Sequence, residues 1–151
     1  MGIAADEALM ARALRLAKDA ERLGEVPVGC VIVRDGEVVA EAHNAPISVH
    51  DPTGHAEIRA LRRAGAAVSN YRLPECDLYV TLEPCAMCTG AMIHARIRRL
   101  VFGAPDPRTG AAGSAIDLTD GSYGNHRLDV TSGVLADESS AMLRAFFRAR
   151  R

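Results

Sequence analysis

Long hydrophobic runs are absent from this chain of 151 residues. Its longest apolar stretch, at residues 26–33, falls well short of the roughly 20 residues that a helix needs to cross a bilayer. The first residues include Asp6 and Glu7 and lack the basic and then apolar pattern of a secretory signal. We therefore expect a cytoplasmic protein that makes no use of a membrane.

Cysteines are few, and their pattern does not indicate disulfides. The chain has four of them, and a protein that is not exported rarely builds a disulfide framework. Metal binding and core packing are then the usual roles of cysteine. Cys85 and Cys88 form a C-x-x-C motif, whereas Cys30 lies in an apolar run and Cys76 near a turn. We expect Cys30 and Cys76 to be buried without a chemical role.

Lysine is almost missing, since Lys18 is the single lysine among 18 basic residues. The formal net charge is -1, so the overall charge does not indicate a nucleic-acid-binding protein. The arginines form two groups in the sequence, which are Arg96, Arg98 and Arg99 in the first and Arg144, Arg148, Arg150 and Arg151 in the second. Either these arginines form a solvated face, or they contact phosphate, which the guanidinium group binds in a bidentate way.

The composition is that of a globular domain. About half of the residues are apolar (48%) and a quarter are charged (25%), which excludes a fully disordered or collagen-like chain. No internal repeat, low-complexity linker or composition change divides the sequence. We expect a single domain over residues 1–151, a length that allows a substantial core.

Hydrophobic periodicity predicts alternating helices and strands. Helices are expected at residues 7–23, 56–67, 85–95 and 137–150. Strands are expected at residues 28–33, 38–42, 77–82, 99–103 and 128–131. The Asp35-Gly36 pair between the first two strands predicts a hairpin. Residues 104–126 are rich in Gly, Pro and Asp and are expected to form a loop with a short helix near Ala115. This alternation predicts an α/β sheet covered by helices on both faces.

Three residues carry the groups that zinc prefers, imidazole and thiolate. They are His55, Cys85 and Cys88. The two cysteines are three positions apart, so on a helix they point from one face. They also stand at the predicted start of a helix, where the dipole and the free N–H groups favour thiolate over thiol. The spacing therefore indicates a metal site.

Three ligands leave one of the four coordination positions of zinc open. Structural zinc sites are normally closed by four protein ligands, whereas catalytic sites keep one position for water, whose pKa the metal lowers to about 7. Such a site needs a proton carrier that is not a ligand, and Glu57 follows His55 by two residues. Residues at this spacing do not share a helix face, so we expect His55 at the start of the helix and Glu57 in its first turn.

The candidate residues form a longer pattern, H-A-E followed after residues 58–83 by P-C-A-M-C. This is the H-x-E…P-C-x-x-C signature of zinc-dependent nucleobase deaminases. Two other interpretations stay open at this point. One is a structural zinc site with Cys76 or His43 as fourth ligand, and the other is a redox-active cysteine pair. The redox interpretation leaves His55 and Glu57 without a role.

Beyond this signature, the chain closely resembles the bacterial tRNA-specific adenosine deaminases (the TadA type). The similarity runs from about Leu9 to the C-terminus. The segments that carry it include EVPVG (25–29), HNAPI (43–47), HDPTGHAEIRAL (50–61), LYVTLEPCAMCTGAMIHARI (78–97), VFGAPDPRTGAAGS (101–114) and FFRARR (146–151). Relatives that deaminate cytidine or guanine share the short signature, but the longer segments are typical of the tRNA branch.

The resemblance implies a fold, a cofactor and a substrate. The expected fold is the cytidine deaminase-like three-layer α/β/α sandwich with a five-stranded mixed sheet. The expected cofactor is one Zn2+ per subunit, with no organic cofactor, in a homodimer whose subunits both shape each site. The expected substrate is the wobble adenosine of a tRNA anticodon stem-loop, which hydrolysis converts to inosine with release of ammonia.

The resemblance also implies roles for the matching residues near the metal. His55, Cys85 and Cys88 would bind zinc, and Glu57 would carry protons between water, the adenine ring and the leaving amino group. Asn44 would contact the flipped nucleotide. Since Asn44 lies among turn residues, it is also a candidate for capping a loop.

Three further residues are expected to contact the RNA. Asp106 and Arg108 match the anticodon-loop contacts of the family, and Phe147 matches its C-terminal helix, which lies beside the RNA. Each also has a purely structural interpretation that stays open. Asp106 lies between two prolines and is a candidate turn former, while Phe147 lies on an apolar helix face that would suit the core or a dimer interface.

Two other functions compete with tRNA deamination. A deaminase of free nucleosides or bases, such as cytosine or guanine, would release ammonia from small molecules without RNA. A catalytically silent, zinc-stabilised RNA-binding module would bind RNA and leave it unchanged. Substrate comparison and the Glu57→Gln variant distinguish these possibilities.

Overall fold

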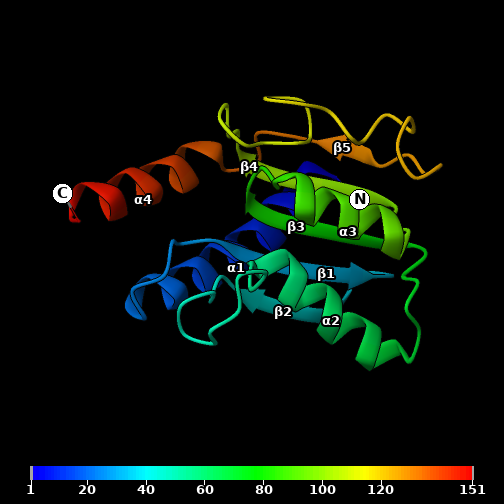
Figure 1. Ribbon diagram of the computed structural model, residues 1–151, viewed down its shortest axis with the longest axis horizontal. Coiled ribbons are helices and arrows are strands. Elements are labelled where there is room, and N and C mark those ends of the chain that lie inside the picture. The colour runs from blue at the N-terminus through cyan, green and yellow to red at the C-terminus, as the bar shows by residue number, and fades with distance from the viewer. Residues whose placement is uncertain (1, 151) are drawn as a thin grey trace.

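The computed structural model describes residues 2–150, which form a five-stranded sheet with helices on both faces (Figure 1). The strands lie in the order β2-β1-β3-β4-β5. β1 is antiparallel to β2 and β3, whereas β3, β4 and β5 are parallel. Their bounds are Gly29–Arg34 for β1, Glu37–His43 for β2, Cys76–Leu82 for β3, Arg99–Ala104 for β4 and Asp129–Thr131 for β5. The predicted mixed sheet is confirmed.

The helices divide between the two faces of the sheet. Their bounds are Ile3–Arg22 for α1, Ala56–Val68 for α2, Ala86–Ala95 for α3 and Ala136–Arg148 for α4. In Figure 1, α2 and α3 lie in front of the sheet and α1 lies behind it. The segment that leads into α4 packs with the α1 cluster through Val134 and Leu135. The predicted three-layer α/β/α sandwich is therefore confirmed.

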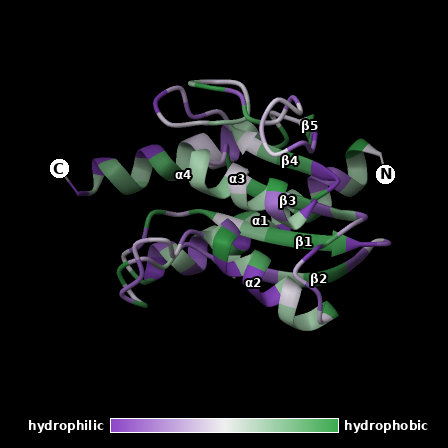
Figure 2. Cartoon of the chain, turned by 45° about the vertical axis from the view of Figure 1, so that its right-hand side comes forward, coloured by the Kyte–Doolittle hydropathy of each residue, from purple (hydrophilic) through white to green (hydrophobic). Residues whose placement is uncertain are grey.

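The central strands are buried on both faces, which explains their continuous apolar sequences. Alternate residues of β1 point to opposite layers, so Val31 packs with the α1 cluster and Ile32 with the α2–α3 cluster. Apolar colour is accordingly concentrated on the inner strands in Figure 2. Cys30 and Cys76 are fully buried in the α2–α3 cluster, as predicted. At Gly29 a Cβ atom would collide with the Ala13 carbonyl oxygen, so glycine allows α1 to lie close against the sheet.

The hairpin between β1 and β2 forms as predicted. Both turn residues have positive φ angles, 53° at Asp35 and 78° at Gly36. This left-handed conformation is the one that an Asp-Gly turn between twisted strands requires. The outer strand β2 is then tied to α2 by two arginines, because Arg59 donates to the His43 carbonyl at 2.5 Å and Arg63 donates to the Glu41 carbonyl at 2.7 Å.

The short helix predicted near Ala115 is wrong. The residues after β4 form turns, with isolated bridges between Ala112 and Asp117 and between Asp120 and Arg127. The N–H groups of Ala112 and Ser114 donate to the carboxylate of Glu83, at 3.1 Å each, and are not part of a helix. An acidic side chain from another part of the sequence therefore replaces the local hydrogen bonds that a helix would need.

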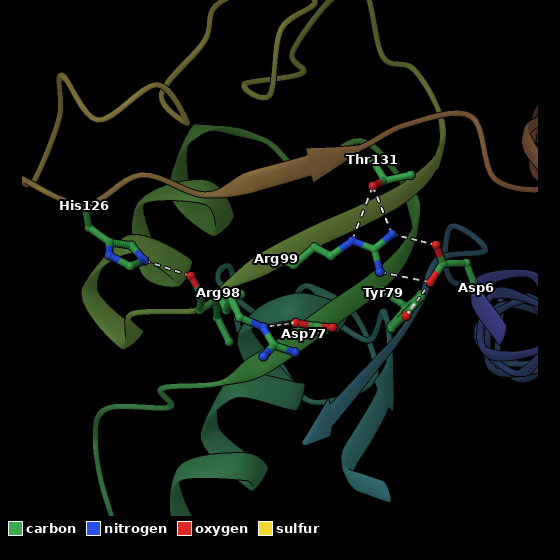
Figure 3. A network of polar contacts seen from close by, with 8 residues as sticks. Asp6, Asp77, Tyr79, Arg98, Arg99, His126 and Thr131 are labelled. Carbon is green, nitrogen blue, oxygen red and sulfur yellow. Dashed lines mark hydrogen bonds and ion pairs between the residues drawn. The ribbon is translucent and has the colours of Figure 1, made fainter. Parts of the chain in front are cut away.

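Asp6 links α1 to the sheet (Figure 3). Its carboxylate is 4% exposed, pairs with Arg99 at 2.6 and 3.0 Å, and accepts the hydroxyl of Tyr79 at 2.7 Å. Arg99 also donates to Thr131 Oγ1 at 3.0 Å. The helix, β3, β4 and β5 thus meet at one buried ion pair. Because α1 begins at Ile3 and not at the predicted residue 7, Asp6 lies in the first turn, where the helix dipole favours an acid.

No helix within residues 2–150 combines the length and the apolar character that a bilayer crossing requires.

Candidate active site

The amino ends of α2 and α3 meet at one end of the sheet. His55 is the residue that caps the start of α2, and Cys85 caps the start of α3. Both have extended backbone conformations, and Cys88 follows in the first turn of α3. The Nδ1 atom of His55 lies 3.4 Å from the Cys88 sulfur and 3.7 Å from the Cys85 sulfur. The loop at residues 43–54 and the end of β3 thus bring together ligands that are 30 residues apart in sequence.

This arrangement fits zinc. The three ligand atoms lie within 4.8 Å of one another, and two ligands on a tetrahedral zinc ion are separated by about 3.5 Å. One imidazole and two thiolates are donors that zinc prefers. Among residues 2–150, the group includes neither Cys76 nor His43, so the interpretation as a closed structural site lacks its fourth ligand.

The three ligands shift the pKa values of one another. A hydrogen bond from Cys88, stronger than the opposing effect of burial, lowers the pKa of Cys85 to about 4. The same hydrogen bond and burial raise the pKa of Cys88. A hydrogen bond with Cys85 raises the pKa of His55. Cys85 is therefore the more acidic of the two thiols, and a dication placed among the three groups favours thiolate at both cysteines.

Glu57 lies in the first turn of α2 and is 4% exposed. Burial raises its pKa to about 7. Its surroundings include His55, Cys85 and Cys88, which also influence this pKa. The structure confirms that His55 lies at the start of the helix and Glu57 in the first turn, on the same cavity. A carboxyl group with this pKa is suited to accept and to donate protons at neutral pH.

A cavity of about 180 Å³ opens above these residues. Its walls come from the segment after α1, from the end of β3 and from the loops after β2 and β4. The lining residues are Val26, Val28, Asn44, His55, Glu57, Leu82, Glu83, Cys85, Asp106 and Thr109. Two of the zinc ligands, His55 and Cys85, therefore share one cavity with the candidate proton carrier and with two of the predicted substrate contacts, Asn44 and Asp106.

Asn44 and Asp106 combine structural contacts with access to the cavity. Asn44 is 8% exposed, and its Nδ2 atom donates to the Val26 carbonyl at 3.3 Å. Asp106 accepts the N–H groups of Arg108 and Thr109 at 3.1 and 3.2 Å and the Thr109 hydroxyl at 2.8 Å. Asp106 does form a turn, as its structural interpretation predicts, and the same turn places it in the cavity wall.

Two of the predicted contacts lie outside the cavity. Arg108 is exposed on the loop and does not line it. Phe147 is 49% exposed on α4, where it lines a separate hollow of about 340 Å³ with Leu143, Arg144 and Arg148. The exposure of Phe147 contradicts the interpretation as a core residue. Arg151, which belongs to the predicted basic group, lies outside the described residues.

Sequence reasoning assigned no role to two residues of the cavity wall, Glu83 and Thr109. Glu83 is 2% exposed. Burial alone would raise the pKa of Glu83, but hydrogen bonds from Ser114, Asp106 and Ala112 lower it below its ordinary value. The signal in the sequence was an acid directly before P-C-x-x-C, but its partners follow more than 20 residues later and no local pattern connects them.

Comparison with known proteins agrees with this geometry. Residues 3–104 match the family described as cytidine and deoxycytidylate deaminase zinc-binding region. The tRNA-specific adenosine deaminase of Haemophilus influenzae is 54% identical to this chain over 147 residues, which cover 97% of this chain and 85% of that protein. This chain belongs to the tRNA-specific adenosine deaminases of that family. The Bacillus subtilis tRNA-specific adenosine deaminase is 44% identical over 146 residues, covering 97% of this chain and 91% of that protein.

A solved structure leads to the same family. It comes from a study of A-to-I editing by tRNA:A34 deaminases at the wobble position of transfer RNA, and it matches this deaminase with a TM-score of 0.84 at 46% identity. The match covers 87% of this chain and 95% of that one. The zinc ligands and Glu57 all lie within the matched zinc-binding region at residues 3–104.

Proposed function

We propose that this deaminase hydrolyses adenosine to inosine at the wobble position of a tRNA anticodon and releases ammonia. The observation that carries the proposal is the cluster of His55, Cys85 and Cys88 at a cavity that Glu57 also lines. The relatives that act on tRNA match nearly the whole chain, which favours this substrate over free bases.

The chain supplies the ligands and the proton carrier. His55, Cys85 and Cys88 would hold the metal, and zinc bound there lowers the pKa of water in its open position to about 7. Glu57 would accept a proton from the attacking water on a carboxylate oxygen and deliver it to N1 of adenine. Glu57 would then take the remaining proton from the oxygen that is now bonded to C6 and deliver it to the amino group, and the C6–N bond breaks as the C6=O bond forms. The oxygen of water ends on C6 and the nitrogen leaves as ammonia, so the reaction balances.

The adenine base must leave its stack to reach Glu57. Bases in an anticodon loop are single-stranded and only partly stacked, so this movement is inexpensive. We propose that Asn44 contacts the inserted nucleotide within the cavity and that Asp106, which also lines the cavity, orients the neighbouring nucleotides. Arg108 and Phe147, both exposed, would contact nucleotides that remain outside.

We also propose that the protein is a homodimer. Along α2 and α3 runs an apolar hollow of about 830 Å³, whose lining includes Ile58, Leu61, Ala91 and the 77% exposed Tyr71. Large exposed apolar surfaces of this kind favour association between proteins, and a second copy would bring its own α2 and α3 to this face. Residues 1–151 would act as a single deaminase domain in the cytoplasm, the compartment of mature tRNA.

The deciding experiment is incubation of the zinc-loaded protein with an anticodon stem-loop that carries adenosine at the wobble position. We expect inosine at that position alone, read by sequencing and by mass. Free adenosine, cytidine and guanine serve as parallel substrates and should release no ammonia. Ammonia from a free base, with an unchanged stem-loop, would replace tRNA deamination by small-molecule deamination.

Replacement of Glu57 tests the proton carrier. Because Glu57→Gln keeps the size of the side chain and one acceptor oxygen but removes its acid–base chemistry, we expect turnover of the stem-loop to fall by about 10²-fold or more. Zinc content, measured by atomic absorption, should stay at the wild-type level. Unchanged turnover in the zinc-loaded variant would remove Glu57 from the mechanism.

A further inference from the structure

Glu83 is a buried carboxylate that the proposed reaction does not use. It lies between the end of β3 and Pro84-Cys85, so it directly precedes the segment that delivers a zinc ligand. It also contributes to the cavity wall. A buried charge needs compensation, and the compensation of Glu83 comes from the loop after β4.

Four hydrogen bonds join the Glu83 carboxylate to this loop. Oε1 accepts the N–H of Asp106 at 3.0 Å, and Oε2 accepts those of Ala112 and Ser114 at 3.1 Å each. The hydroxyl of Ser114 also donates to Oε1. Hydrogen bonds to a charged acceptor are the stronger kind, and here they hold both ends of residues 106–114.

The backbone next to Glu83 is joined to the same loop. The N–H of Glu83 donates to the Ala104 carbonyl, and the N–H of Ala111 donates to the Pro84 carbonyl, both at 2.8 Å. The loop also closes tightly over the carboxylate, since a Cβ atom at Gly110 would collide with the carboxyl carbon of Glu83. The loop is therefore joined both to the side chain of Glu83 and to the backbone of residues 83 and 84.

We propose that Glu83 is a positioning residue that holds the loop at residues 105–114 so that Asp106 and Thr109 form the substrate-facing wall of the cavity. The inference rests on the proposed function, because it assigns that wall to the tRNA substrate. Glu83 touches neither substrate nor metal in this role. It acts through the loop, and it couples the loop to the zinc-binding turn that begins at Cys85.

The variant Glu83→Gln removes the negative charge. It also replaces one acceptor oxygen by an NH2 group, which cannot accept a hydrogen bond from the N–H groups of the loop. Hydrogen–deuterium exchange, followed by mass spectrometry of the zinc-loaded protein, measures the loop directly. We expect the peptide over residues 105–116 to exchange about tenfold faster than in the wild type, while a peptide within α2 is unchanged. Gly110→Ala keeps the carboxylate, but its Cβ would displace both that carboxylate and the Asp106 carbonyl, so this variant should give the same pattern.

Kinetics on the stem-loop then separate positioning from structure. For Glu83→Gln we expect KM to rise about tenfold, from the loss of charged hydrogen bonds, with a much smaller change in kcat. Asp6→Asn is the matched control, because it removes another buried carboxylate far from the cavity, and it should leave KM unchanged although it destabilises the fold.

The inference is overturned if loop exchange is unchanged in both Glu83→Gln and Gly110→Ala, or if exchange rises while KM stays the same. Loss of zinc or of folding in both variants would show that Glu83 maintains the structure of the zinc site instead. That result would also overturn the inference. If the wild type forms no inosine, the proposed function fails by itself, and the exchange comparison still decides whether Glu83 orders the loop.

Discussion

His55 and Glu57 are two residues apart, a spacing that places side chains on different sides of a helix. The chain resolves this conflict by starting α2 between them. His55 keeps an extended backbone with φ of -67° and ψ of 153°, whereas Glu57 is helical. Both side chains can then face one cavity. The start of α2 thus lies between the zinc ligand and the proton carrier, and their side chains still reach the same cavity.

Cys88 is a fully buried member of the ligand group, so its replacement tests metal binding directly. We expect Cys88→Ala to lose bound zinc, because two remaining protein ligands do not hold it well. Cys76→Ala, another buried cysteine that lies outside the ligand group, should retain it. Atomic absorption after gel filtration measures both, and full zinc occupancy in Cys88→Ala would exclude Cys88 as a ligand.

The zinc ligands could be predicted from the sequence because their spacing reflects local geometry, two helix starts and one helical turn. Glu83 could not, because what makes it important is a set of donors at residues 106–114 that only the fold brings close. Phe147 was ambiguous for the same reason. An apolar residue on a helix face is typical of a core, and the tertiary structure leaves this one exposed.

At the scale of elements, α1 depends on the Asp6–Arg99 pair. The hydrogen bond from Arg99 lowers the pKa of Asp6 below its ordinary value. The ionised carboxylate therefore stabilises the folded state above the unfolded pKa of about 3.9, and this stabilisation is lost as the pH falls through the lower folded value. The pair thus ties the helix to the sheet at neutral pH and releases it only in acid.

We expect Asp6→Asn to reduce the free energy of unfolding by about 2 kcal/mol at pH 7, because it leaves the half-buried Arg99 without its charged partner. The difference from wild type should shrink as the pH falls below about 4. Urea denaturation over this pH range measures it. Asp19→Asn breaks the exposed pair with Arg22 and should cost less than about 1 kcal/mol. Equal costs in the two variants would contradict the role of Asp6.

The arginines near the C-terminus form either a solvated face or a phosphate-binding surface, and replacement of two of them distinguishes these interpretations. Arg150 stacks on the Phe146 ring at 3.5 Å, so Arg144 and Arg148 are the better choice. If they contact phosphates, the double variant Arg144→Ala/Arg148→Ala should make the fall of log affinity with log salt shallower by about 1.5. Fluorescence anisotropy with the stem-loop measures this slope. Arg34→Ala, at the far end of the sheet, is the control, and an unaltered slope in the double variant would favour the solvated face.

Element order and type were predictable because most elements have clear periodicity and clear ends. The hairpin followed from Asp35-Gly36, and the closing helix from its apolar spacing. The stretch at residues 104–126 was not predictable in detail. Its hydrogen bonds go to Glu83 and to side chains within its own turns, such as Asp117 and Thr119, and such bonds leave no periodic trace.

At the scale of the whole molecule, the hollow along α2 and α3 predicts self-association. Sedimentation equilibrium should give about twice the chain mass of 16.1 kDa. Tyr71→Asp places a charge on this face and should shift the mass to that of one chain. Ile3→Asp alters an equally exposed apolar residue at the start of α1 and should leave the mass unchanged. A Tyr71→Asp variant that keeps the doubled mass would move the interface elsewhere.

The arginine contacts on β2 bear on how copies of this chain are able to meet. A bare outer strand is a template on which another chain adds its own strand, and this is a common start of aggregation. Here the guanidinium groups of Arg59 and Arg63 already hold two carbonyls that such a neighbour would need. At the opposite border, β5 has only three residues. Both edges of the sheet are thus poor sites for the addition of a strand from another molecule. We therefore expect copies of this chain to associate through helical surfaces and to resist aggregation at high concentration.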